Sequence, residues 1–76
     1  MLELIDVIEE FLAKAPKEID EALNIVEELS FKILNWAKLE GDTYMVFFLS
    51  DRTGILYAMY INIPVESEYD IIINIM

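Results

Sequence analysis

The sequence predicts an α+β domain in two layers, with two N-terminal helices packed on a three-stranded antiparallel sheet in the order ααβββ. Apolar residues recur at helical spacing as far as Ala37. β-branched and aromatic residues dominate after Gly41. A run of turn-forming residues, 50–54, then separates two strand-like segments, as in an antiparallel hairpin. A chain of 76 residues is short enough that 1–76 is predicted to form a single domain.

The first helix is predicted over residues 2–15. Its apolar residues fall on one side of a helical wheel and its charged residues fall on the other, which is typical of a helix packed on a core. The apolar side comprises Leu4, Ile5, Val7, Ile8, Phe11, Leu12 and Ala15. Pro16 disfavours helical geometry at Ala15 and suits the first turn of a following helix. These two residues therefore predict a corner between two helices.

The second helix is predicted over residues 17–39. Acidic residues in its first turn complement the positive end of the helix dipole, and Gly41 supplies a stop just beyond its end. Its apolar face covers about half of the helical wheel. Phe31 and Leu39 project from the polar half. Either a neighbouring segment covers them, or they form a second contact surface for a partner.

Three strands are predicted, over residues 43–49, 55–63 and 69–76. Each segment is rich in β-branched and aromatic residues and lacks helical periodicity. Gly54 can adopt the left-handed conformation that a tight turn between the first two strands requires. Pro64 lacks a backbone N–H donor, so it ends the second strand.

Both faces of the predicted sheet are apolar. In the first strand, for example, Val46 and Phe48 point to one face and Phe47 points to the other. Two helices can cover one face, and no further segment remains for the second. Contiguous exposed apolar patches usually mark protein interfaces, and closed homo-oligomers dominate soluble assemblies. The sequence therefore predicts a homo-oligomer, most simply a dimer through the sheet.

The residues predicted to form this interface are Val46, Phe48, Tyr57, Met59, Ile72 and Phe31. A different protein could take the place of the second copy. Pairing of strand edges is another possible geometry, because the segment 69–76 is rich in isoleucine and carries little charge. The sequence leaves the choice between stacking of sheet faces and pairing of strand edges open.

The charge and hydropathy of the chain limit its partners. The net charge is −10, from five basic and fifteen acidic residues, which repels phosphate backbones and anionic lipid headgroups. We therefore predict no nucleic-acid and no membrane partner. The longest apolar stretches are shorter than the roughly 20 residues that a membrane span needs, and the N-terminal residues are acidic where a secretory signal is basic. We expect a soluble, cytoplasmic protein.

Few catalytic groups are present. The chain has no His and no Cys, so it can form no disulfide, no common zinc site and no thiol or histidine-based nucleophile pair. We predict no catalytic residue, no metal ligand and no cofactor. Glu66, Glu68 and Asp70 alternate along an extended stretch and could offer oxygen ligands to Ca²⁺ or Mg²⁺. They are the basis of one alternative, a metal-dependent enzyme that uses carboxylates.

These observations favour a small acidic homo-oligomeric protein-interaction module without catalysis. A second interpretation is an inhibitor that imitates nucleic acid and binds a basic protein, which requires the carboxylates to form an ordered stripe. The composition, with many Ile, Glu and Lys and without Gln or Cys, also resembles that of proteins from hot environments. An AT-rich genome would favour Ile, Lys and Asn as well.

Overall fold

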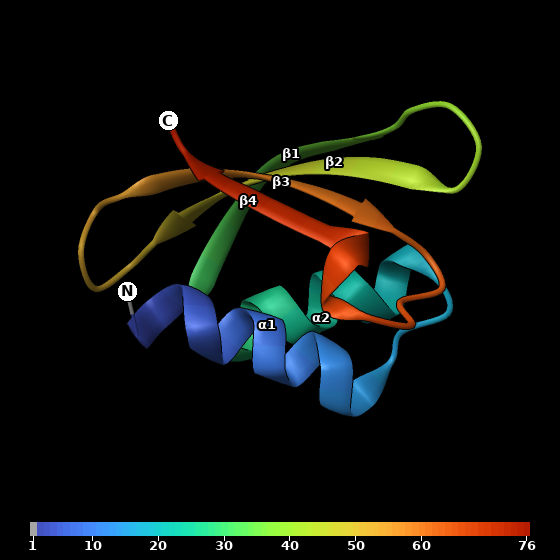
Figure 1. The fold of residues 1–76 in the computed structure, drawn as a ribbon. Coiled ribbons are helices and arrows are strands. Elements are labelled where there is room, and N and C mark those ends of the chain that lie inside the picture. Colours follow the sequence, from blue (N-terminus) through green and yellow to red (C-terminus); the bar gives the residue numbers. More distant parts are fainter. Residues whose placement is uncertain (1) are drawn as a thin grey trace.

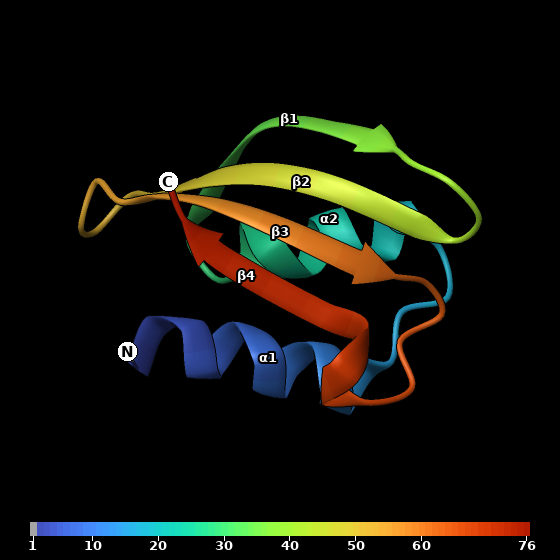
Figure 2. The ribbon, with the colours of Figure 1, turned by 45° about the horizontal axis from the view of Figure 1, so that its top comes forward.

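Two helices and four strands follow one another in the order ααββββ in the computed structural model, which describes residues 2–76. Both helices cover one face of the sheet and leave the other face open (Figures 1 and 2). The elements are α1 (Leu2–Lys14), α2 (Ile19–Glu28), β1 (Phe31–Lys38), β2 (Thr43–Ser50), β3 (Leu56–Asn62), the 3₁₀ turn η1 (Glu68–Asp70) and β4 (Ile71–Ile75). The predicted α+β class, with two helices and an antiparallel sheet, is confirmed.

The predicted number of strands is wrong, because the sheet has four strands rather than three. Helix α2 ends at Glu28, and the second half of the predicted helix 17–39 is strand β1. The backbone reverses at Ser30, which has a positive φ of 70°, a conformation incompatible with a continuing right-handed helix. The broad apolar face predicted for residues 17–39 therefore has two origins. Its first part belongs to a helix, and its second part begins a strand, in which buried Phe31 is followed by exposed Lys32.

The four strands form an antiparallel meander in the order β1-β2-β3-β4. Strands β2 and β3 lie within one residue, at each end, of the predicted strands 43–49 and 55–63. The predicted strand 69–76 begins instead as η1, because Ser67 caps this turn and the Asp70 carboxylate accepts the Ser67 N–H at 3.1 Å.

The corner between the helices is longer than predicted. Helix α1 ends at Lys14, and Ala15 has a positive φ of 44°. Helix α2 begins only at Ile19, so Pro16 belongs to the connection and not to a first helical turn. Pro16 is buried, and its carbonyl accepts the Val65 N–H at 3.2 Å. The proline therefore joins the corner to the segment after β3.

The core lies between the helix layer and the inner face of the sheet. Helix α1 contributes Val7 and Phe11, and helix α2 contributes Ile25 and Val26. The inner face contributes Phe31, Val46, Phe48, Tyr57, Met59, Ile61 and Ile71. Phe31 packs edge-on against Phe48, with ring centroids 5.0 Å apart. Phe31 is thus covered by its own chain, as one of its two interpretations stated, whereas Leu39 is 42% exposed.

Candidate functional site

The outer face of the sheet is the largest apolar surface that the helices leave open. Residues directly paired across antiparallel strands share a face. The pairs Met45–Tyr60, Phe47–Ala58 and Leu49–Leu56 alternate with the buried pairs of β2 and β3, so all six residues lie on the outer face. Ile72 of β4 pairs with Tyr60 and extends this surface toward the sheet edge. We call these seven residues the outer patch.

No strand residue on this face carries a carboxylate. The four strands contain no Asp or Glu, and their only charged residues are Lys32 and Lys38 of β1. The acidic residues of the chain lie in the helices and connections, with Asp6 and Glu9 of α1 and Glu21 of α2 exposed. The molecule therefore has an acidic helix layer on one side and, on the other, a largely apolar sheet face whose strands carry no carboxylate.

The structure places the six predicted interface residues on different faces. Five of them lie in the core beneath the helices: Val46, Phe48, Tyr57 and Met59 at 0% exposure and Phe31 at 4%. Ile72 is 58% exposed and belongs to the outer patch. The sequence analysis missed the patch residues of β2 and β3. Polar residues could have indicated the face, because Thr43, Asn62 and Asn74 all fall in the outer-facing register.

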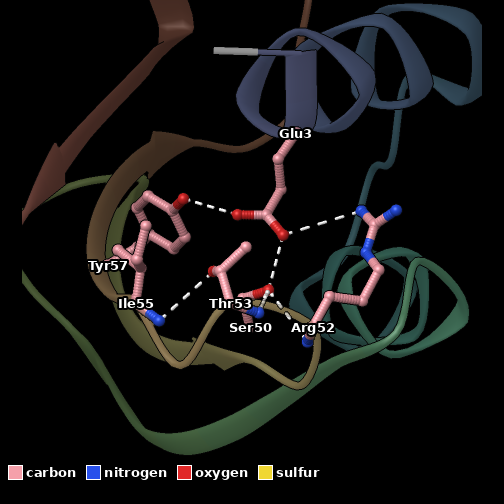
Figure 3. Close-up of polar contacts among 6 residues, drawn as sticks. All are labelled: Glu3, Ser50, Arg52, Thr53, Ile55 and Tyr57. Atoms are coloured by element: carbon pink, nitrogen blue, oxygen red, sulfur yellow. Dashed lines mark hydrogen bonds and ion pairs between the residues drawn. The ribbon is translucent and has the colours of Figure 1, made fainter.

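A buried carboxylate is the second unusual feature of the protein. Glu3 of α1 is 8% exposed, and its two oxygens accept hydrogen bonds from Ser50 Oγ and Tyr57 OH at 2.5 Å each (Figure 3). Arg52 Nη2 lies 3.6 Å from Glu3 Oε1. Ser50 Oγ also accepts the backbone N–H groups of Arg52 and Thr53. Glu3 therefore ties the first turn of α1 to the β2–β3 hairpin.

Sequence reasoning placed Glu3 on the solvent side of α1. On the wheel it lies at the border between the charged and the apolar residues, so its neighbours in the fold decide its environment. Ser50 and Tyr57 lie about fifty residues further along the chain, and the sequence offers no signal that joins them to Glu3. No pocket is formed by the residues that the structure describes. The carboxylate, with its partners, is a structural contact between layers.

The pKa values of this cluster have identifiable causes. Burial by itself raises the pKa of the Glu3 carboxyl, but the hydrogen bonds from Ser50 and Tyr57 and the charge of Arg52 outweigh it. The net pKa of Glu3 lies below its ordinary value of 4.5. Burial, together with the hydrogen bond to Glu3 and its negative charge, raises the pKa of Tyr57 to about 12. Glu3 is therefore ionised and Tyr57 neutral across the physiological range.

These two groups predict how stability depends on pH. The contribution of Glu3 is present above pH 4.5 and is lost as the pH falls through its lower folded-state pKa. The contribution of Tyr57 is present below pH 10.0 and is lost as the pH rises from 10.0 to about 12. We expect Tyr57→Phe to remove the loss of stability at alkaline pH. The measurement is the free energy of unfolding in urea, compared with that of the wild type at each pH. An identical alkaline fall in both proteins would contradict the assignment.

The three carboxylates considered for metal binding do not form a cluster. Asp70 Oδ2 accepts the Glu66 and Ser67 N–H groups at 2.8 and 3.1 Å, and these bonds lower its pKa. Glu66 and Glu68 are exposed. Within residues 2–76, no three Asp or Glu residues lie close enough together to hold a metal ion.

Comparison with known protein families, curated proteins and solved structures found no significant match to this chain. No helix between residues 2 and 76 is both long enough and apolar enough to cross a membrane.

Proposed function

We propose that the protein is a small acidic interaction module that dimerises through the outer face of its sheet and has no catalytic role. One observation carries the proposal: an apolar face whose strands carry no carboxylate, left open by both helices, in a chain of net charge −10. Tyr60 and Ile72 are 38% and 58% exposed, so aromatic and aliphatic side chains meet water across neighbouring strands. Such surfaces are rare in soluble monomers and mark interfaces.

The size of the face suits a small dimer. Four strands about 4.8 Å apart, at about 3.3 Å per residue, span roughly 19 by 25 Å at their longest. Stacking two such faces buries on the order of 1,000 Å² in total, which reaches the lower bound for a specific interface. The total accessible surface of one copy is 4659 Å². The dimer would therefore cover about a tenth of each copy, a share typical of small proteins.

The distribution of charge favours a second copy as the occupant. Two chains of net charge −10 repel each other in most orientations. Stacking the sheets places the two helix layers, with their exposed carboxylates, at opposite ends of the dimer. The stacked sheets stand about 10 Å apart, already more than the Debye length of about 8 Å at physiological salt. This orientation minimises repulsion between the copies while it buries the apolar face.

Two substitutions test the dimer, and each adds one negative charge, one on the outer face of the sheet and one on the helix side. We expect Tyr60→Asp to weaken dimerisation by about a hundredfold or more, because a carboxylate in the centre of the interface loses its hydration. The measurement is solution mass by light scattering across a dilution series. Asn24→Asp is the matched control, since it adds the same charge at an exposed position of α2. It should leave the mass unchanged.

Two results would reject the dimer. One is a wild-type protein that remains monomeric at high micromolar concentration. The other is a Tyr60→Asp variant that keeps the dimer mass. Ile72→Asp, at the more exposed position of the patch, gives a second variant in case Tyr60→Asp folds poorly.

Mimicry of nucleic acid is the second candidate function. The exposed carboxylates of α1 and α2 share the helix layer, which gives a basic protein an acidic surface. Lys14 interrupts that surface, with Nζ 3.5 Å from Glu10 and 3.4 Å from Glu28. Binding to a basic protein that disappears in moderate salt and in a variant with neutralised α2 carboxylates would support mimicry. If Tyr60→Asp abolishes this binding instead, the basic protein binds to the outer patch.

A further inference from the structure

The two edges of the sheet differ in how well they are protected. The β1 edge carries a bulge between Ile33 and Asn35, and the Trp36 N–H donates to Asn35 Oδ1 at 2.9 Å. Lys38 lies at the end of this strand. Bulges, lysines and side chains that satisfy free backbone groups are the usual means of preventing another strand from pairing at an edge. The β1 edge is therefore blocked.

The β4 edge has no such protection. Its pairing with β3 runs without a shift in register, and the Met76 N–H donates to the Leu56 carbonyl at 2.9 Å. Because residues of an antiparallel strand alternate in the direction of their backbone groups, Ile72 and Asn74 also face β3. The N–H groups of Ile73 and Ile75 then point away from the sheet. The Ile71 N–H is satisfied, since it donates to the Glu68 carbonyl.

An apolar flank of α1 lies beside this open edge. Lys14 contacts Glu28 of α2, so the side of α1 that carries Lys14 faces α2. The opposite side of the helix carries Ile5, Ile8 and Leu12, and Ile5 and Leu12 are 48% and 41% exposed. Both views of the ribbon place α1 beneath β4 (Figures 1 and 2). A strand added to β4 would point every second side chain toward this flank.

The surroundings of the edge are acidic. No Lys or Arg occurs from Thr53 to the last residue, Met76. Glu66, Glu68 and Asp70 lie just before β4, and Glu9 is exposed on α1. Opposite charge favours association and speeds encounter. A partner strand with Lys or Arg residues is attracted to this end of the molecule by the net negative charge, whereas an acidic strand is repelled.

We propose that the β4 edge binds an extended segment of another protein, in which apolar residues alternate with Lys or Arg, as a fifth strand of the sheet. The apolar residues would cover Ile5 and Leu12, and the free backbone groups of Ile73 and Ile75 would hold the segment through main-chain hydrogen bonds. A second copy fits this edge less well than it fits the outer face. Pairing two β4 strands would bring two α1 helices, each with exposed Asp6 and Glu9, close to one another.

The test uses a seven-residue peptide of alternating lysine and valine, blocked at both ends, and NMR of the labelled full chain. In the free protein, the amides of Ile73 and Ile75 should exchange with water quickly, while those of Ile72 and Asn74 are protected. Saturating peptide should slow exchange at Ile73 and Ile75 by roughly tenfold or more, as expected for amides that enter a ladder. A peptide with glutamate in place of lysine should not bind at the same concentration.

Ile73→Pro changes the free edge and also replaces a side chain that packs against the core. It removes an N–H that points away from β3, so the ladder between β3 and β4 keeps its bonds. We expect it to weaken peptide binding by tenfold or more, whereas Ile73→Val, which keeps the donor, binds normally. Unchanged melting of the free protein would show that Ile73→Pro keeps the fold. If Ile73→Pro unfolds the sheet, the exchange measurement on wild type decides alone.

Three outcomes would overturn the proposal. In the first, saturating peptide leaves exchange at Ile73 and Ile75 unchanged. In the second, the glutamate peptide binds as well as the lysine peptide. In the third, both amides are protected without peptide and the protein has a dimer mass, which would assign the edge to a second copy. Stacking through the outer patch leaves these amides exposed, so the outer-face dimer and the edge site can fail independently.

Discussion

Replacing Phe48 by alanine is expected to lower the free energy of unfolding by about 3–5 kcal/mol. The Phe48 ring is completely buried and packs against Phe31 and Tyr57, with centroids 5.0 and 5.4 Å away. Alanine would leave a cavity beneath the helices that these neighbours can fill only in part. A domain of this size has a total stability of roughly 4–11 kcal/mol. The variant should therefore be close to unfolded in dilute solution, as circular dichroism during urea titration would show.

Phe47→Ala is the matched substitution on the opposite face of the same strand. Phe47 points to the outer face and is partly exposed, so its loss should cost the monomer less than the loss of Phe48. If the outer patch is a dimer interface, the cost of Phe47→Ala rises with protein concentration, because dimerisation stabilises the folded state by mass action. The cost of Phe48→Ala should not depend on concentration in this way. Equal costs at every concentration would contradict the assignment of the two faces.

Glu3→Ala is expected to lower the free energy of unfolding by about 2–4 kcal/mol, although it removes a charge from an acidic protein. The substitution leaves the hydroxyl groups of Ser50 and Tyr57 without their acceptor, and these residues are 1% and 0% exposed. It also releases the first turn of α1 from the β2–β3 hairpin. Urea unfolding at neutral pH measures the effect, and hydrogen exchange in the first turn of α1 should increase.

Two variants separate this effect from simple removal of charge. Glu9→Ala removes a carboxylate from an exposed position of the same helix, so it should change stability by less than about 0.5 kcal/mol. Glu3→Gln keeps one carbonyl acceptor and should cost less than Glu3→Ala. A Glu3→Ala variant as stable as Glu9→Ala would mean that the buried hydrogen bonds contribute nothing to the fold.

The sequence predicted those strands well whose composition fits a strand and does not fit a helix. Segments 43–49 and 55–63 combine β-branched and aromatic residues with a turn between them, and no helix fits that composition. Residues 31–38 are predicted to be helical because Ile33, Leu34 and Trp36 satisfy helical spacing, and the bulge between Ile33 and Asn35 breaks the alternation typical of a strand. The pairing of β1 with β2, which buries Phe31 against Phe48, decides between the two. That pairing is a contact between distant residues, which local periodicity does not contain.

For the candidate surfaces, too, the sequence predicts some features and only the packing of the elements decides the others. That the sheet is apolar on both sides follows from the residues of its strands, and so does the expectation of an open apolar face. Which residues form that face depends on where the helices pack. Five of the six predicted interface residues lie on the covered side, and only Ile72 lies on the open side. The contacts of Glu3 with Ser50 and Tyr57 could not be predicted, because they join residues from three separate elements.

The sequence by itself determined the α+β class, the acidity and an amount of apolar strand surface that two short helices cannot cover. These properties are sums over residues or patterns of neighbouring residues, so they do not depend on tertiary contacts. The tertiary structure alone decided that the sheet has four strands, which of its faces is open and which of its edges is free. Those features arise from the packing of α1 and α2 on one side of the sheet and from the pairing of β1 and β4 with their neighbouring strands. Both depend on contacts between residues that are distant in the sequence, and local sequence patterns do not contain such contacts.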